Sequence, residues 1–252
     1  MIHFVGAGPG AVDLITVRGA ELLKRASTVV YAGSLVNPAL LSFCPPSCVV
    51  LDSASMSLDE IILALQEGEA RGGVTVRLHT GDPCLWGAIR EQMDRLDELG
   101  ISYDVVPGVS SFCAASAALR AELTRPGVSQ SVILARQAGR TPVPDGQRLS
   151  DLARCGSTMV LFLSAGLVKE AVQELLDAGL PGSTPACAVY KASWPDERTA
   201  ETTLDDLAGE MARLGMTKTT MILVGGALSR APVQTSLLYD RSFGHGYRKS
   251  EE

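Results

Sequence analysis

Short apolar runs alternate with helical patterns along most of the chain, and this alternation constrains the fold more than any other feature. The expected strands are residues 2–5, 28–31, 49–51, 74–78, 102–106, 132–136, 158–163, 186–191 and 220–224. The expected helices are residues 16–24, 57–71, 87–99, 110–119, 168–178 and 203–213. Short buried strands separated by helices are typical of a parallel sheet with helices on its faces. The sequence therefore predicts an α/β fold.

The alternation stops between about residues 119 and 130 and then starts again. A chain of 252 residues is long enough for two small domains. We therefore expect two α/β domains, 1–118 and 119–252, each a mostly parallel sheet flanked by helices, with the active-site cleft between them. The end of the chain, from about residue 235, is rich in glycine and charge, and we expect it to form a flexible tail.

Composition excludes several classes of protein. The net charge is −6, from 28 acidic and 22 basic residues, which argues against a general nucleic-acid binder. The apolar runs are shorter than the roughly 18 residues of a membrane span, and the N-terminus lacks a secretory pattern, so we expect a cytoplasmic protein away from the membrane. Of the six cysteines only Cys44 and Cys48 are close, and the three histidines are scattered, so we expect reduced thiols and no metal site.

A glycine-rich loop, Gly6-Ala7-Gly8-Pro9-Gly10-Ala11, joins the first strand to the first helix. It fits the spacing of the dinucleotide fingerprint, but that fingerprint also needs an acidic residue at the end of the second strand. No acid follows Tyr31 directly, and Pro9 removes a backbone N–H from the part of the loop that would face a pyrophosphate. The loop therefore either brings the backbone close to a different ligand or is a tight turn without one.

Three further loops of small residues follow expected strands, at 33–34, 80–83 and 107–111. Ligands of parallel sheets bind at the carboxyl ends of the strands, so four such loops indicate a binding site at that edge. Asp82 is the most distinctive residue among them. Its carboxylate either points into the crevice or has a structural role, in which it caps the next helix or braces its own turn.

Together these loops resemble the tetrapyrrole (class III) S-adenosylmethionine-dependent methyltransferases. The resemblance rests on VGAGPG at 5–10 with Asp13 and Leu-Ile-Thr at 14–16, on VTVRLHTGDP at 74–83 with Gly87, and on VPGVSS at 106–111. In the second of these the arginine stands one place earlier than in the family pattern. It covers about residues 1–230. The family's fold has two α/β domains with the cofactor in the cleft between them, and its members are normally homodimers, so the resemblance implies the same here.

Finer features resemble the branch of the family that methylates C11 of precorrin-4 or cobalt-precorrin-4 in corrin biosynthesis. They are YAGSLV at 31–36, ELTRPGVSQ at 122–130 and GRTPVP at 139–144. One departure is Cys84-Leu85-Trp86, where a Ser-x-Tyr type of sequence is more usual. Uroporphyrinogen-III methyltransferase, diphthine synthase and a non-catalytic nucleotide-binding module remain alternatives, and the presence of cobalt in the substrate stays open.

The resemblance implies S-adenosyl-L-methionine as cofactor, with S-adenosyl-L-homocysteine as product, and it suggests ten contacts. Pro9 would lie beside the cofactor in the glycine loop, and Leu163, Ala192 and Thr219 of the second domain would surround the adenine. The residues suggested around the methionine end are Thr80, Gly81, Asp82, Leu85, Ser110 and Ser111. Methyl transfer from a sulfonium mainly requires alignment and exclusion of water, and no residue identifies itself as a catalytic base.

A tetrapyrrole substrate carries many carboxylates, and these need cationic partners. Residues 118–148 contain five arginines and only two acids. Arginine suits carboxylates because its planar fork can bind them bidentately. We therefore predict substrate contacts from this segment, while a solvated basic surface is an equally good interpretation; the candidates are Arg120, Arg125, Arg136 and Arg140.

Overall fold

The structure is a computed structural model that describes residues 1–33, 35–232 and 236–250. The chain forms two compact units, each with its own sheet. The first unit comprises Met1–Ala115 together with Lys191–Glu197, and the second comprises Ser116–Tyr190 and Arg198–Glu252. Ser34 and Thr235, at a predicted loop and at the start of the predicted tail, lie outside the described residues.

The sheet of the first unit has the strand order β3-β2-β4-β1-β5, and all four pairings are parallel. The parallel sheet predicted for this half of the chain is therefore confirmed. Because the strands run the same way, the loops that follow them meet at one edge. The strands are β1 (Ile2–Gly6), β2 (Ala26–Tyr31), β3 (Val49–Asp52), β4 (Val74–His79) and β5 (Tyr103–Val106).

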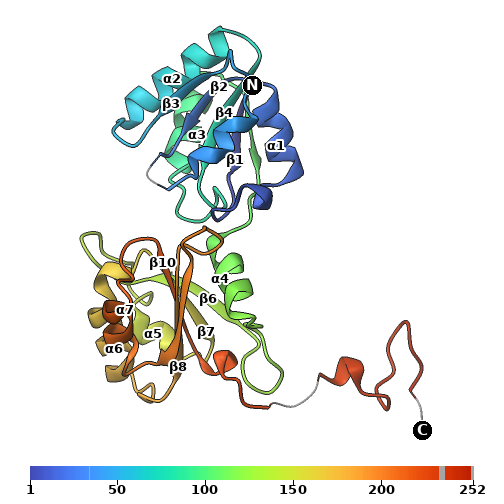
Figure 1. Cartoon of the computed structure of the whole chain (residues 1–252), viewed down its shortest axis with the longest axis vertical. Helices are drawn as coiled ribbons and strands as arrows, with labels where there is room; N and C mark the ends of the chain where they lie inside the picture. Colours follow the sequence, from blue (N-terminus) through green and yellow to red (C-terminus); the bar gives the residue numbers. More distant parts are fainter. Residues whose placement is uncertain (34, 233–235, 251–252) are drawn as a thin grey trace. The chain divides into compact units, whose positions relative to one another are not determined.

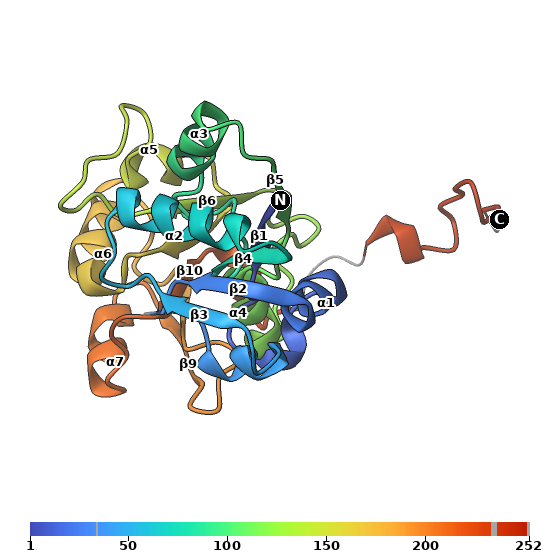
Figure 2. The same cartoon turned by 90° about the horizontal axis from the view of Figure 1, so that it is seen from above.

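Helices cover both faces of this sheet, with α2 and α3 on one side and α1 on the other (Figure 2). They are α1 (Val17–Lys24), α2 (Leu58–Ala70), α3 (Arg90–Glu98) and the 3-10 helix η2 (Pro38–Phe43), and α4 (Ser111–Leu119) follows β5. The predicted capping box of α2 is present, since Ser57 and Glu60 each accept a hydrogen bond from the other's backbone N–H. Helix α3 begins three residues later than predicted because Trp86 and Ala88 adopt left-handed backbone angles, with φ of 53° and 49°.

The sheet of the second unit, with the order β6-β7-β10-β8-β9, is mixed (Figure 1). Only β6 and β7 are parallel, whereas β10 is antiparallel to both of its neighbours and β8 is antiparallel to β9. The expectation of a mostly parallel sheet is therefore wrong for this unit. The strands are β6 (Val132–Arg136), β7 (Thr158–Phe162), β8 (Pro185–Tyr190), β9 (Arg198–Thr203) and β10 (Thr220–Val224).

Strand β9 explains the difference. We predicted a helix from residue 203 and no strand before it, but Arg198–Thr203 pairs with β8. Antiparallel neighbours need only a loop between them, whereas parallel neighbours need a crossover of a dozen or more residues. The loop between β8 and β9 is Lys191–Glu197, the segment that packs in the first unit.

The second unit has a separate apolar core, built on the sheet and on three helices that pack in sequence order. These are α5 (Leu149–Ala153), α6 (Val168–Asp177) and α7 (Leu207–Arg213), of which α5 was not predicted. They lie together on one side of the sheet (Figure 1). Among the residues that the structure describes, none of the helices combines the length and apolar character needed to cross a membrane.

Candidate cofactor-binding site

Two of the predicted loops are joined directly at the carboxyl edge of the first sheet. Gly8 and Gly81 form an isolated β-bridge, with Gly81 N donating to the Gly8 carbonyl at 2.8 Å and Gly8 N to the Gly81 carbonyl at 3.3 Å. Ala7 N adds a hydrogen bond of 2.7 Å to the His79 carbonyl. The glycine loop and the loop after β4 therefore form one continuous backbone surface.

The third loop packs against the other two at positions that only glycine can occupy. A Cβ atom on Gly108 would lie 2.0 Å from the Gly81 carbonyl oxygen and 2.8 Å from Gly6 Cα. A Cβ atom on Gly6 would lie 2.5 Å from Gly108 Cα. Real Cβ atoms do not approach backbone atoms this closely, so these glycines are required for the three loops to meet.

The Asp82 carboxylate holds this arrangement together. Its Oδ1 accepts from Cys84 N at 2.8 Å, which braces its own turn, and its Oδ2 accepts from Gly108 N at 2.9 Å, which pins the loop after β5. Of the two roles considered for Asp82, the structure therefore supplies partners for the bracing one. Ser110, buried, and Ser111, at the start of α4, follow on the pinned loop.

The segment Lys191–Glu197 is a partner of the glycine loop that sequence reasoning missed. Trp194 Nε1 donates to the Pro9 carbonyl at 3.0 Å, and Ser193 Oγ accepts from Ala11 N at 3.0 Å. Ala192, expected from the second domain, therefore belongs to the first unit, where it is buried. Trp194 was the one sequence signal for this contact, because an indole beside the end of a strand needs an acceptor for its N–H.

Left-handed backbone angles mark several predicted cofactor contacts. Leu163 has a φ of 53° and Thr219 a φ of 66°, and Ala192 is flanked by Lys191 and Ser193 at 47° and 69°. Such conformations cost about 1–3 kcal/mol each and persist mainly at functional sites. Leu163 also leaves 67% of its surface exposed, which is unusual for a leucine that directly follows a buried strand.

The four predicted substrate arginines differ in their surroundings. Arg125 donates to the carbonyls of Ala227, Ser229 and Ala231, and Arg136 donates to three carbonyls of residues 137–142. These two guanidinium groups therefore stabilise local chain segments. Arg120 and Arg140 are exposed, and within the described part of the chain their side chains make no hydrogen bond or ion pair. Arg120 and Arg125 line a common hollow of about 280 Å³, while Arg136 and Arg140 do not line it.

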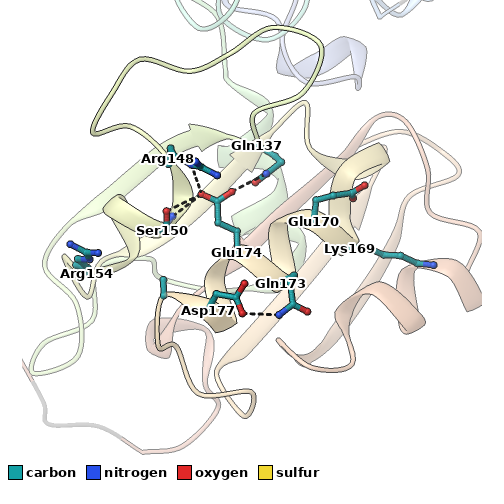
Figure 3. A pocket seen from close by; sticks show the side chains of 10 residues that line it. Gln137, Arg148, Ser150, Arg154, Lys169, Glu170, Gln173, Glu174 and Asp177 are labelled. Carbon is teal, nitrogen blue, oxygen red and sulfur yellow. Dashed lines mark hydrogen bonds and ion pairs between the residues drawn. The ribbon is translucent and has the colours of Figure 1, made fainter.

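A larger hollow of about 800 Å³ lies beside α5 and α6 of the second unit (Figure 3). Its central carboxylate, Glu174, accepts hydrogen bonds from Gln137 and Ser150 and pairs with Arg148. Burial opposes the charge of Glu174, but these hydrogen bonds and the nearby guanidinium outweigh it and lower the pKa of Glu174. The lining contains none of the predicted site residues, and its basic and acidic groups balance. This hollow therefore adds nothing to the candidate site.

Comparison with known proteins identifies the family of the chain. Residues 1–208 match the model of the tetrapyrrole (corrin/porphyrin) methylases. The chain belongs to this family. Among curated tetrapyrrole methylases, the cobalt-precorrin-4 C(11)-methyltransferase of Methanocaldococcus jannaschii is 45% identical, covering 100% of this chain and 97% of the relative. The precorrin-4 C(11)-methyltransferase of Mycobacterium tuberculosis is 46% identical, covering 94% of this chain and 95% of the relative.

Solved structures of tetrapyrrole methylases have the same fold. A cobalt precorrin-4 methyltransferase of cobalamin biosynthesis matches with a TM-score of 0.88 and 46% identity, covering 90% of this chain and 95% of its own. A uroporphyrin-III C-methyltransferase from Thermus thermophilus, solved with S-adenosyl homocysteine, matches with a TM-score of 0.76 and 28% identity, covering 90% of this chain and 98% of its own. The two-domain α/β prediction and the family resemblance are therefore confirmed.

The residues of this tetrapyrrole methylase fit the methyl donor of the family. The three joined loops present backbone N–H and C=O groups at the carboxyl edge of a parallel sheet, where ligands of such sheets bind. Leu163 and Thr219, which the family resemblance implies as adenine contacts, lie in the second unit with left-handed backbone angles, and their role stays a prediction.

Proposed function

We propose that the protein transfers a methyl group from S-adenosyl-L-methionine to C11 of precorrin-4 or cobalt-precorrin-4, in the biosynthesis of the corrin ring of cobalamin. The observation that carries this proposal is the set of joined loops, Gly6–Gly10, Thr80–Asp82 and Gly108–Ser111, in a chain 45–46% identical over nearly its whole length to enzymes with that name. Bound S-adenosyl-L-methionine supplies an electrophilic methyl group on its sulfonium.

The chain's own residues hold and align the reactants. Thr80, Gly81 and Leu85, with Ser110 and Ser111, would surround the methionine end, and Pro9 would pack beside it. Asp82 contributes by pinning the third loop through its 2.9 Å bond to Gly108 N. Leu163, Ala192 and Thr219 stay the proposed adenine contacts. Because the methyl group is already activated, alignment and exclusion of water account for most of the catalysis.

The test is a pair of assays on purified protein. Calorimetric titration should give micromolar binding of S-adenosylhomocysteine and none of NAD, because no acid follows β2 to hold a dinucleotide ribose. Mass spectrometry should then find one added methyl group on the tetrapyrrole, and NMR should place it at C11. Binding without transfer would identify a sensor module, and transfer to uroporphyrinogen III alone would identify another branch of the family.

Side-by-side assays with precorrin-4 and cobalt-precorrin-4 decide whether the substrate contains cobalt. The relatives of similar identity include enzymes with either name, so both substrates are needed.

We also propose a homodimer in the cytoplasm, which rests on the family resemblance and on the composition of the chain. Sedimentation equilibrium should give twice the mass of 26.5 kDa, and a single-chain mass would contradict the dimer.

A further inference from the structure

A hollow of about 310 Å³ lies within the first unit, on the face of the sheet that α2 and α3 cover. Thr80 and Leu85, both proposed cofactor contacts, are in its lining, so it adjoins the candidate site. Most of the other lining residues are apolar, including Leu58, Ile61 and Trp86. Three ionisable residues also line it, and these are Arg77, His79 and Glu91.

Arg77 brings a buried positive charge that has no negative partner in the part of the chain that the structure describes. Only 4% of its surface is exposed, and its hydrogen bonds go to neutral acceptors: Gln92 Oε1 at 3.0 Å, the Val30 carbonyl at 3.2 Å and Ser53 Oγ at 2.8 Å. Burial lowers the pKa of Arg77 to about 10, so it stays charged at neutral pH. Among the described residues no carboxylate pairs with it. An uncompensated buried charge is costly, which favours an anion that arrives from outside.

His79 lies two residues further along β4 on the same face of the sheet. Only 5% of its surface is exposed, and its Nε2 is buried with no hydrogen-bond partner in the described structure. Its ring stacks on Phe4 with centroids 6.0 Å apart. Burial, together with the nearby Arg77 charge, lowers the pKa of His79 to about 3, so the ring is neutral at pH 7. A buried polar atom without a partner is a cost that a ligand can remove.

We propose that this hollow binds a carboxylate-bearing arm of the tetrapyrrole substrate, with the carboxylate held by Arg77 and His79. The proposal rests on the proposed function, and it assigns to substrate two residues that sequence reasoning did not select. The apolar lining suits the methylene groups of such an arm. Among the described lining residues the one acid, Glu91, is exposed, whereas Arg77 and His79 are both buried, so their part of the hollow favours an anion.

The decisive variant is His79→Phe, because binding and structural roles predict opposite results. Removing a buried polar group without a partner should leave the melting temperature unchanged or raise it, and phenylalanine can still stack on Phe4. If His79 binds the carboxylate, the Michaelis constant for the tetrapyrrole should rise about tenfold or more, with affinity for S-adenosylhomocysteine unchanged. Arg77→Lys, which keeps the charge but loses the planar fork, should raise the Michaelis constant in the same direction.

His3→Phe is the matched control. His3 is also buried in this sheet, but its Nδ1 is bonded to Asp104 at 2.6 Å, outside the hollow. This variant should keep the parent's Michaelis constant.

A second readout does not depend on turnover. The chain has three histidines, so the ring signals of His79 can be assigned by NMR from their loss in His79→Phe. Adding uroporphyrin III, an octacarboxylate tetrapyrrole, to protein saturated with S-adenosylhomocysteine should shift these signals and raise the pKa of His79.

The outcomes separate the two proposals. An inactive parent protein whose His79 signals still respond to uroporphyrin III would contradict the proposed function and support the carboxylate site. An active parent whose His79→Phe variant keeps its Michaelis constant would overturn the carboxylate site alone. Weakened S-adenosylhomocysteine binding in that variant, with the tetrapyrrole unaffected, would also overturn it, because the carboxylate would then be that of the cofactor.

Discussion

The two units carry their predicted site residues in different ways. In the first unit, three loops far apart in sequence are joined by backbone hydrogen bonds and by glycines with no room for a side chain. In the second unit, two of the four selected arginines are committed to carbonyls of nearby chain segments. Loop motifs that act through the backbone therefore predict which chain segments meet, whereas a local count of charges does not predict what the charged side chains contact.

The physical reason is that the backbone of a loop has a fixed position, whereas a long side chain can contact many different groups. A glycine loop can do its work only where the backbone turns, so its position in the sequence fixes its position at the sheet edge. An arginine side chain is long and has five donors, so it can bond to any carbonyl within several ångströms. Arg77 illustrates the same point from the other direction, since it lies outside the arginine-rich segment yet is buried, with no acidic partner among the described residues.

Gly108→Ala should give the largest effect, because it tests whether the joined loops tolerate any side chain. The new Cβ would overlap the Gly81 carbonyl, so we expect a loss of about 3 kcal/mol or more in the free energy of unfolding, measured with urea. S-adenosylhomocysteine binding should also be lost.

Gly209→Ala is the control for that substitution. Gly209 lies in α7, and a Cβ atom added there would meet no neighbouring atom within 4 Å, so alanine should stabilise the protein by about 0.5–1 kcal/mol. A Gly108→Ala protein as stable as its parent would show that the loops can separate without cost.

Asp82→Ala should rank second. It removes two hydrogen bonds to a carboxylate, so we expect a loss of about 2–3 kcal/mol in the free energy of unfolding, with weaker cofactor binding as a consequence. If affinity falls while stability is unchanged, the carboxylate contacts the cofactor directly instead of bracing the loops.

Arg125→Ala and Arg140→Ala sharpen the contrast within the second unit. Arg125→Ala should lower the free energy of unfolding by about 1–2 kcal/mol, because three carbonyls lose a donor at a partly exposed site. Arg140→Ala should change stability by less than about 0.5 kcal/mol. Any rise it causes in the Michaelis constant for the tetrapyrrole should shrink in high salt. If Arg125→Ala leaves the free energy of unfolding unchanged and raises the Michaelis constant for the tetrapyrrole, Arg125 is a substrate residue after all.

The last comparison, the pH dependence of stability, gives the smallest effect at neutral pH and a growing one as the pH falls. The pKa of His79 is about 3 in the folded protein and 6.5 when unfolded, so the unfolded chain binds a proton first as the pH falls. His79 therefore lowers stability progressively below pH 6.5. His79→Phe should flatten the decline between about pH 6.5 and 5.5, where few carboxylates titrate. Parallel curves for parent and variant in urea titrations would contradict the buried, neutral state of His79.

Much of the fold follows from the sequence, for reasons visible in particular elements. The strands of the first unit were predicted because buried apolar runs end at glycines, as β1 does at Gly6. Strand β9 was missed because Arg198–Thr203 has a single buried apolar residue, Ala200, and resembles the exposed start of a helix. The residues of a strand do not specify whether it runs parallel or antiparallel to its neighbours. The antiparallel pairing of β10 with β7 and β8 could therefore not be predicted from its own sequence.

The candidate site also has parts that the sequence predicts and parts that it does not. The three loops were found from their glycines, whereas the contacts of Trp194 and Ser193 with the glycine loop join residues more than 180 positions apart. Nothing near either end of those contacts specifies the other end. The hollow around Arg77 and His79 was also missed, because strand residues that face a cavity look like core residues in sequence.

The placement of Lys191–Glu197 in the first unit bears on how the protein is made. During synthesis the first 115 residues emerge together, but the Pro9 carbonyl and the Ala11 N–H cannot meet their partners until residue 194 has been added. A fragment ending at residue 115 would hold all of the first sheet and still lack those two hydrogen bonds. The glycine loop is thus among the first segments translated, yet its contacts are complete only after about three quarters of the chain has been made.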